Sequence, residues 1–168
     1  MPSDPDELSG AKVREATVGD AEHIHALVRE LADAVGDRHP EPGVVRDRLS
    51  ELLKEPRAGV LVAEDGEGGI SGAVSFWIKP DLAHGDIVVE VPTLVVAEKA
   101  RRNGIGRMLM DEVRERAAGE GVTLVELVAT RQNEAAREFY RSLGFVETDL
   151  VALEFVGDLQ KPPENEEQ

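Results

Sequence analysis

A glycine-containing turn, placed between an apolar stretch and a helix-forming stretch, is the segment of this sequence best suited to bind a ligand. Residues 94–109 read Leu-Val-Val-Ala-Glu-Lys-Ala-Arg-Arg-Asn-Gly-Ile-Gly-Arg-Met-Leu. Gly104 and Gly106 allow backbone conformations and a close approach to a ligand that a Cβ would prevent. The first N–H groups of the helix that follows lack partners within the helix and carry partial positive charge. With Arg102 and Arg107 beside them, they predict a cradle for a pyrophosphate.

The spacing of these glycines argues against two common nucleotide motifs. The Walker pattern G-x-x-x-x-G-K-[ST] is absent, and Leu109 stands where a dinucleotide fingerprint has its third glycine. A nucleotide-binding switch is therefore a remote alternative. A simpler alternative is a tight strand-to-helix turn that binds no ligand, because such a turn alone is only weak evidence for binding.

Two motifs resemble the signatures of the GNAT superfamily of acyl-CoA-dependent N-acyltransferases. Arg101-x-x-Gly104-x-Gly106 is similar to the R/Q-x-x-G-x-G/A signature. Residues 133–145, Asn-Glu-Ala-Ala-Arg-Glu-Phe-Tyr-Arg-Ser-Leu-Gly-Phe, are similar to the second signature, N-x-x-A-x-x-F-Y-x-x-x-G-F. The resemblance extends over roughly residues 12–155. It implies an α/β (α+β) fold with a mixed, mostly antiparallel central sheet and helices on both faces.

The resemblance also implies acetyl-CoA as the acyl-donor cosubstrate. The backbone before the turn would bind the pantetheine arm, the turn would bind the pyrophosphate, and a backbone N–H near Val96 would polarise the thioester carbonyl. Asn133 would touch the pantetheine arm, although it also suits a helix N-cap. The predicted cofactor-binding residues are Leu94, Val95, Val96, Arg101, Arg102, Asn103, Gly104, Ile105, Gly106, Arg107, Asn133 and Tyr140.

Tyr140 matches the tyrosine that often protonates the departing CoA thiolate in this family. A phenol with a pKa of about 10 can share a proton with a thiol in a desolvated site. Asn133 and Tyr140 are seven residues apart, so one helix face carries both. The alternative is a core aromatic residue whose hydroxyl binds a backbone carbonyl.

The general base is less well defined. Some family members supply a glutamate five residues before the Asn133-type asparagine, but this sequence has Val128 there. Glu90 is the second catalytic candidate, because it would share a strand face with Leu94 and Val96 if no bulge intervenes. A solvated carboxylate is the alternative for Glu90, and a water relay to a distant base would also suffice. Trp77 is expected to pack, with acceptor stacking as the alternative.

Hydrophobic periodicity predicts the elements that position these residues. The order is β-α-α-β-β-β-α-β-α-β, a hairpin-rich first half joined to a βαβαβ second half. Strands are expected at residues 13–16, 59–64, 70–78, 87–96, 122–129 and 145–155. Helices are expected from residue 17 or shortly after it to 35, through 45–53, and at 105–117 and 134–143.

The composition predicts one folded domain between two acidic tails. The chain has 168 residues, of which 41% are hydrophobic. Residues 1–10 and 157–168 are predicted to be disordered, and residues 11–156 to form the acetyltransferase domain. The net charge of −15 disfavours nucleic acid as a partner. No apolar run is long enough for a membrane span, and the N-terminus lacks a signal-peptide pattern, so a cytoplasmic protein is expected.

The predicted function is transfer of acetyl from acetyl-CoA to a primary amine, by direct attack in a ternary complex. The chain has no cysteine, which excludes a cysteinyl-acyl intermediate. No metal site is expected, because the histidines lack ligand spacing. A small-molecule acceptor is favoured over a peptide or protein, and a non-catalytic acyl-CoA-binding regulatory module is the alternative. A homodimer is compatible with the family, although no heptad or apolar stripe specifies one.

Overall fold

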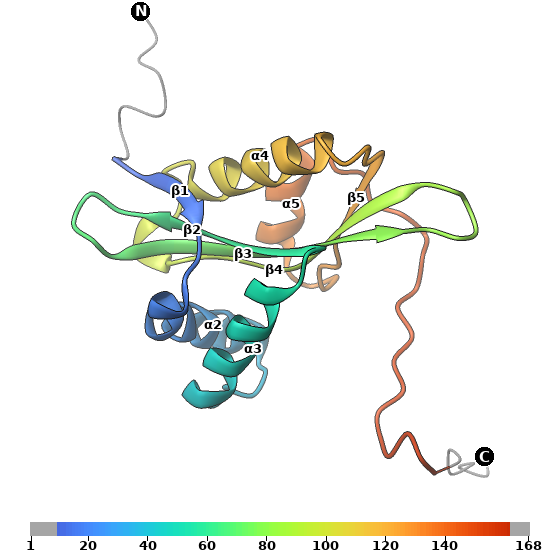
Figure 1. The fold of residues 1–168 in the computed structure, drawn as a ribbon, viewed down its shortest axis with the longest axis horizontal. Helices are drawn as coiled ribbons and strands as arrows, with labels where there is room; N and C mark the ends of the chain where they lie inside the picture. Colours follow the sequence, from blue (N-terminus) through green and yellow to red (C-terminus); the bar gives the residue numbers. More distant parts are fainter. Residues whose placement is uncertain (1–9, 162–168) are drawn as a thin grey trace, which may run out of the picture.

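A five-stranded sheet forms the centre of the protein (Figure 1), which we describe from a computed structural model covering residues 10–161. The strands lie side by side in sequence order. The first four pair antiparallel, and the last pair is parallel. Their bounds are β1 (Lys12–Glu15), β2 (Ala58–Glu64), β3 (Ile70–Pro80), β4 (Ile87–Val96) and β5 (Leu124–Glu126).

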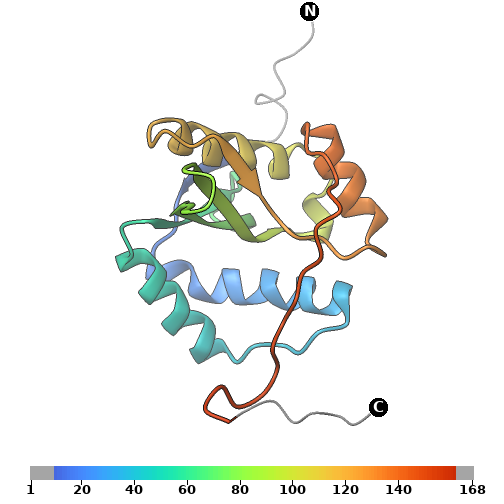
Figure 2. The same cartoon turned by 90° about the vertical axis from the view of Figure 1, so that its right-hand side faces the viewer.

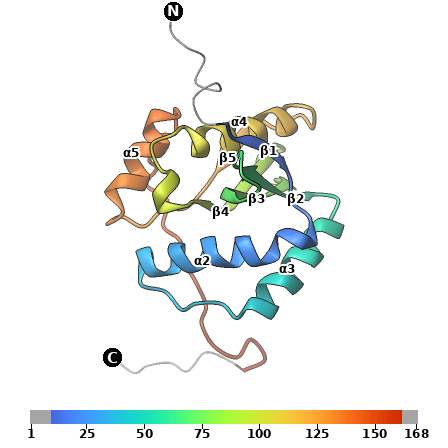
Figure 3. The same cartoon turned by 90° about the vertical axis from the view of Figure 1, so that its left-hand side faces the viewer.

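Helices cover both faces of this sheet (Figures 2 and 3). A 3-10 turn, η1 (Val18–Asp20), leads into α2 (Ala21–Val35), and α3 (Pro42–Lys54) packs beside α2 on one face. A second 3-10 turn, η2 (Glu98–Ala100), precedes α4 (Ile105–Ala118), which covers the other face together with α5 (Glu134–Ser142). The predicted fold class is therefore confirmed.

The sheet separates two hydrophobic clusters. Leu61, Val74 and Val89 face α4, whereas Val62, Ala73 and Val95 face α2 and α3. Because successive strand residues point to opposite faces, a strand covered on both sides is apolar at nearly every position. This explains why β2, β3 and β4 are predominantly apolar.

A β-bulge interrupts β4. Ser75 of β3 pairs with Thr93 and Trp77 pairs with Glu90, so two residues of β4 lie opposite the single residue Phe76. One of these two is Pro92, which has no N–H to give to a ladder and is tolerated at bulges. The bulge reverses the alternation of side chains along β4.

The last predicted strand is not formed. Residues 145–155 have no strand conformation, and their side chains from Val146 onwards are exposed. The prediction of a strand at 122–129 was also too long, because only Leu124–Glu126 pairs with β4. A strand requires a partner edge, and within residues 10–161 no strand pairs with the outer side of β5.

Two other predictions concern parts of the chain that the structure covers only partly. The predicted tails fall largely on residues 1–9 and 162–168, which lie outside the described residues. Within the described part, no helix is long and apolar enough to cross a membrane.

Candidate active site

The site begins where β4 and β5 stop pairing. The two strands pair at three positions, the last of which joins Glu90 to Glu126. Residues 91–96 of β4 have no partner on that side among the described residues, and we call this stretch the open edge of β4. The bulge at residues 91–92 bends β4 at the position where the pairing ends.

Backbone groups of two predicted cofactor-binding residues point to the open edge. The N–H of Ala97 donates to the carbonyl of Ser71, 2.8 Å away, so Ala97 faces β3. By strand alternation Val95 also faces β3, whereas Leu94 and Val96 face the open edge. The Nε of Arg101 donates to the Val96 carbonyl from that side, at 3.3 Å. Leu94 and Val96 therefore present backbone groups to a ligand, and Val95 does not.

The turn that follows β4 leads into a helix without a side-chain cap. Arg102 has a φ of 68°, the only positive φ of a non-glycine residue among residues 10–161. Gly104, with a φ of 78°, is the N-cap of α4 and offers no side-chain acceptor. The N–H groups of Ile105, Gly106 and Arg107 thus have neither an intrahelical partner nor a capping side chain.

Three arginines surround this helix start. Arg101, Arg102 and Arg107 are exposed, and none forms an ion pair with another described residue. Arg107 donates only to the carbonyl of Ser142, at 3.4 Å. In a chain with a net charge of −15, three unpaired cations beside free N–H groups make a local anion site.

Gly106 also has a packing role, which sequence reasoning missed. A Cβ at this position would lie 2.8 Å from Cζ of Phe139. The absence of a side chain therefore lets α5 pack directly on α4. Gly106 thus helps to position the next element of the site, α5.

Asn133 caps α5. Its Oδ1 accepts a hydrogen bond from the N–H of Ala136 at 3.1 Å. This confirms the N-cap interpretation. The amide NH₂ of Asn133 donates to no other residue in the described part of the chain, so it remains available to a ligand.

Tyr140 lies between two aromatic rings. The ring centroids of Phe139 and Phe145 are 5.3 Å and 5.6 Å from that of Tyr140. Burial raises the pKa of the Tyr140 phenol above its ordinary value of 10.0. Its hydroxyl binds no backbone carbonyl of residues 10–161, so the purely structural alternative for Tyr140 lacks its expected hydrogen bond.

Glu90 does not share a face with Leu94 and Val96. Leu94 and Val96 pack toward the cluster under α4, as do Val89 and Val91, so the bulge puts Glu90 on the opposite face. The expectation of a common face was wrong for this reason.

Glu90 lies in a row across the strands, between Trp77 of β3 and Glu126 of β5. Its carboxylate forms an ion pair with Lys79. Sequence reasoning missed Lys79, although its place two residues after Trp77 put it on the same strand face.

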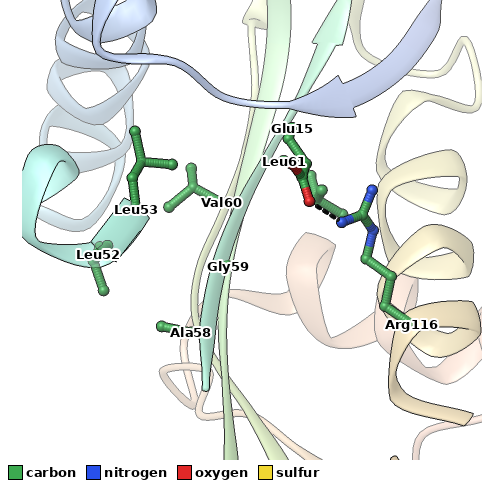
Figure 4. Close-up of a pocket in the computed structure, with 8 residues that line it drawn as sticks. All are labelled: Glu15, Leu52, Leu53, Ala58, Gly59, Val60, Leu61 and Arg116. Atoms are coloured by element: carbon green, nitrogen blue, oxygen red, sulfur yellow. Dashed lines mark hydrogen bonds and ion pairs between the residues drawn. The ribbon is translucent and has the colours of Figure 1, made fainter. Parts of the chain in front are cut away.

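The pocket in Figure 4 lies away from the open edge. It is lined by residues of β1, β2, α3 and α4, including the ion pair between Glu15 and Arg116. Its volume of about 90 Å³ is far below the roughly 300–1,000 Å³ of typical ligand sites. We also find no group of three or more metal-ligating side chains in the described residues.

Comparison with known proteins agrees with this geometry. Residues 24–145 match the Acetyltransferase (GNAT) family. This chain belongs to the GNAT family.

Two mycothiol acetyltransferases have sequences similar to this chain. A mycothiol acetyltransferase of Pseudarthrobacter chlorophenolicus is 30% identical over 147 residues, which cover 84% of this chain and 44% of the relative. A mycothiol acetyltransferase of Thermobifida fusca is 28% identical over 153 residues, with coverage of 84% and 45%. The chain thus spans less than half the length of these two relatives.

A solved structure shows the same GNAT-type architecture. It is described as a transcriptional regulator from Bacillus halodurans C-125, and its TM-score to this chain is 0.75 at 28% identity. The match covers 88% of this chain and 99% of the other. The similarity therefore extends over nearly the whole described part of the chain.

Proposed function

We propose that this protein transfers the acetyl group of acetyl-CoA to a primary amine, with direct attack in a ternary complex. The observation that carries the proposal is the continuous path from the open edge of β4 to the uncapped start of α4. Along this path the protein first presents backbone groups of the extended strand β4 and then free N–H groups beside three unpaired arginines. Such a series matches an elongated ligand that ends in a pyrophosphate.

The residues present fit acetyl-CoA. Leu94 and Val96 would hold the pantetheine arm through their backbone. The turn at 101–104 and the N–H groups of Ile105, Gly106 and Arg107 would hold the pyrophosphate, with the Arg101 and Arg102 side chains and Asn103 beside them. The free amide NH₂ of Asn133 could donate a hydrogen bond to the pantetheine arm.

The chemistry needs one proton acceptor and one proton donor. Acetyl-CoA supplies a thioester; the amine nitrogen bonds to the acetyl carbon, the C–S bond breaks, and the thiolate leaves. The amine loses a proton and the thiolate gains one. Tyr140 is the proposed donor, because its raised pKa keeps the phenol protonated at neutral pH and its hydroxyl has no internal partner.

Glu90 is the proposed acceptor of the amine proton. It lies at the last paired position of β4 and β5, where the open edge begins. An alkylamine with a pKa of about 10 arrives as a cation. It would exchange with Lys79 as the partner of the Glu90 carboxylate, and Glu126 adds negative charge in the same row as Trp77. An aromatic face and carboxylates together favour an ammonium group.

The acceptor is proposed to be a small molecule. The two curated relatives are mycothiol acetyltransferases, which favours a small-molecule acceptor over a protein. We further propose action in the cytoplasm without nucleic-acid or membrane partners, because a net charge of −15 repels phosphate backbones and anionic lipid.

The decisive experiment measures release of CoA from acetyl-CoA with a thiol reagent, over a panel of amines, aminoglycosides, amino acids and peptides. The chain has no cysteine and adds no background. Release that depends on one amine class would support the proposal and identify the acceptor. Glu90→Gln should then lower kcat at neutral pH, while Glu67→Gln, the same change at an exposed position in the β2–β3 turn, serves as the matched control.

A non-catalytic acyl-CoA-binding regulator is the second candidate. The observation in its favour is the similar Bacillus halodurans structure that is described as a transcriptional regulator. This candidate predicts that acetyl-CoA raises the melting temperature while no acceptor gives turnover. If the protein is such a regulator, Tyr140→Phe should leave acetyl-CoA binding unchanged, and neither the variant nor the wild type should transfer acetyl groups. Absence of both turnover and thermal shift would reject the two candidates together.

A further inference from the structure

Lys79 binds the Glu90 carboxylate from the neighbouring strand. In the pairing of β3 with β4, Lys79 lies opposite Val88, so it meets Glu90 on the diagonal, two residues further along β4. Its Nζ donates a hydrogen bond to Oε2 of Glu90 within the ion pair described above. Diagonal neighbours on one sheet face are within reach of a long side chain. A primary amine of the chain itself therefore contacts the group that we propose as the acceptor of the amine proton.

The Nζ of Lys79 lies where the nitrogen of an acceptor has to lie. A general base must be within hydrogen-bond distance of the proton that it removes, either directly or through one water. The amine of an acceptor would therefore bind against the Glu90 carboxylate, where the structure has the Lys79 ammonium. The open edge of β4, which we propose to bind the pantetheine arm, begins one residue after Glu90. Before an acceptor binds, Lys79 is the amine at this position.

The ion pair is also able to open. The Lys79 and Glu90 side chains retain 50% and 43% of their full exposure, and Lys79 lies beyond Trp77, the last residue of β3 that pairs with β2. Exposed ion pairs between long side chains are weak. The flexible stem of a lysine lets its nitrogen move without a change in the backbone. The Lys79 Nζ can therefore leave the carboxylate once it has given up a proton.

We propose that this protein acetylates its own Lys79 when acetyl-CoA is bound and no acceptor is present. This activity rests on the proposed function, acetyl transfer, and uses the same groups. The Lys79 ammonium gives one proton to Glu90, the neutral Nζ bonds to the acetyl carbon, and the C–S bond breaks. The nitrogen loses a second proton and the thiolate gains one, with Tyr140 as the donor. The products are acetyl-lysine, the CoA thiol and one proton released to water.

Self-acetylation stops after one acetyl group per chain. Acetyl-lysine is neutral, so the modified Lys79 no longer forms the ion pair with Glu90. Among residues 10–161 Lys79 is the only lysine that forms an ion pair with Glu90. The lysines that should stay unmodified are Lys12, Lys54, Lys99 and Lys161.

The first test incubates the protein with acetyl-CoA, without an amine acceptor, and follows the mass of the intact chain. We expect the mass of one acetyl group to be added, and peptide mass spectrometry to place it on Lys79. Lys54 is the internal control for spontaneous acetylation, because it lies exposed in the last turn of α3 and forms no ion pair within residues 10–161. Lys79→Arg should abolish the added mass, and the matched variant Lys54→Arg should retain it. Equal acetylation of Lys79 and Lys54 would overturn the proposal.

A second test measures the rate of Lys79 acetylation. Glu90→Gln should slow it by roughly 100-fold, since a general base contributes at least about that factor, and Glu67→Gln should leave it unchanged. Because the amine and the proposed site belong to one chain, the half-time should not change when the protein is diluted. A rate that rises with protein concentration would show transfer between molecules and would contradict the proposal, as would a wild-type rate for Glu90→Gln.

The thiol-release assay with amine acceptors separates this proposal from the proposed function. Turnover of an amine without acetylation of Lys79 would overturn self-acetylation and leave acetyl transfer to an acceptor intact. Acetylation of Lys79 without turnover of any amine in the panel would support self-acetylation and show that the acceptor lies outside the panel. Absence of both reactions would reject both. An amine that is turned over should also slow the acetylation of Lys79, because the two nitrogens compete for Glu90.

Discussion

The cap of α5 can be separated experimentally from any contact that Asn133 makes with a ligand. Asn133→Ala removes the Oδ1 that accepts the Ala136 N–H at 3.1 Å. Loss of an N-cap side chain costs about 1 kcal/mol in free energy of unfolding, within a range of roughly 0.5–2. α5 has only nine residues and no fully buried side chain, so we expect a value in the upper half of that range.

For a domain of this length, a loss of about 1 kcal/mol lowers the melting temperature by about 2–4 °C. Asn133→Asp is the matched variant. It keeps the acceptor oxygen and adds negative charge at a helix N-terminus, where such a charge is stabilising. We therefore expect Asn133→Asp to melt within a degree or so of the wild type, because the cap is preserved.

The ligand contact is read from the KM for acetyl-CoA in the thiol-release assay. Both variants lose the free NH₂ donor of Asn133, and a lost hydrogen bond of about 0.5–1.5 kcal/mol corresponds to roughly a 2–10-fold higher KM. An unchanged melting temperature for Asn133→Ala would refute the capping argument. A wild-type KM for Asn133→Asp would refute the contact with the cosubstrate.

Three further predictions concern pH and packing. Burial raises the pKa of Tyr140. The stability that the neutral phenol contributes is therefore complete below pH 10 and is lost as the pH rises through the pKa of the folded state. Absorbance titration of this single tyrosine measures the shift, and an ordinary pKa would contradict the prediction. Gly106→Ala should lower the free energy of unfolding by about 1–2 kcal/mol, as measured in urea, because its Cβ would lie 2.8 Å from Phe139; a more stable variant would show that the ring moves freely. Arg14 lowers the pKa of Asp20 through hydrogen bonds of 2.8 and 2.9 Å. The stability from this pair is present above pH 3.8 and is lost as the pH falls through the pKa of Asp20 in the folded state. Asp20→Asn should lower the free energy of unfolding by about 2 kcal/mol at pH 7 and make it less dependent on pH in the acid range. A dependence on pH identical to that of the wild type would exclude this role.

Periodicity predicted the elements of this fold well because burial on a helix or strand is a local property of the sequence. In α4 the residues Ile105, Leu109, Val113 and Ala117 recur every four positions, and all four are buried. Their spacing alone places them on one face. The glycine turn was predictable for the same reason, since the strand, the turn and the helix are consecutive in the chain.

The face on which Glu90 lies was not predictable in this way. Strand alternation assigns faces correctly only until a bulge adds a residue, and the bulge here is defined by pairing with Phe76 on β3. Pro92 was the one local signal, because a proline inside a covered strand is expected at a bulge or an edge. A bulge at Pro92 would have placed Glu90 and Leu94 on opposite faces of the sheet.

Residues 145–155 show a different limit of sequence reasoning. Their apolar and β-branched pattern predicts a strand, because such residues favour strand conformation. A strand also needs a partner edge, and a pattern within one segment does not specify that edge. In the structure no strand of the described chain pairs with the outer side of β5, and the large apolar side chains from Val146 onwards are exposed. The local pattern therefore predicted the conformation that these residues prefer, whereas strand formation depends on pairing with a part of the chain that is distant in sequence.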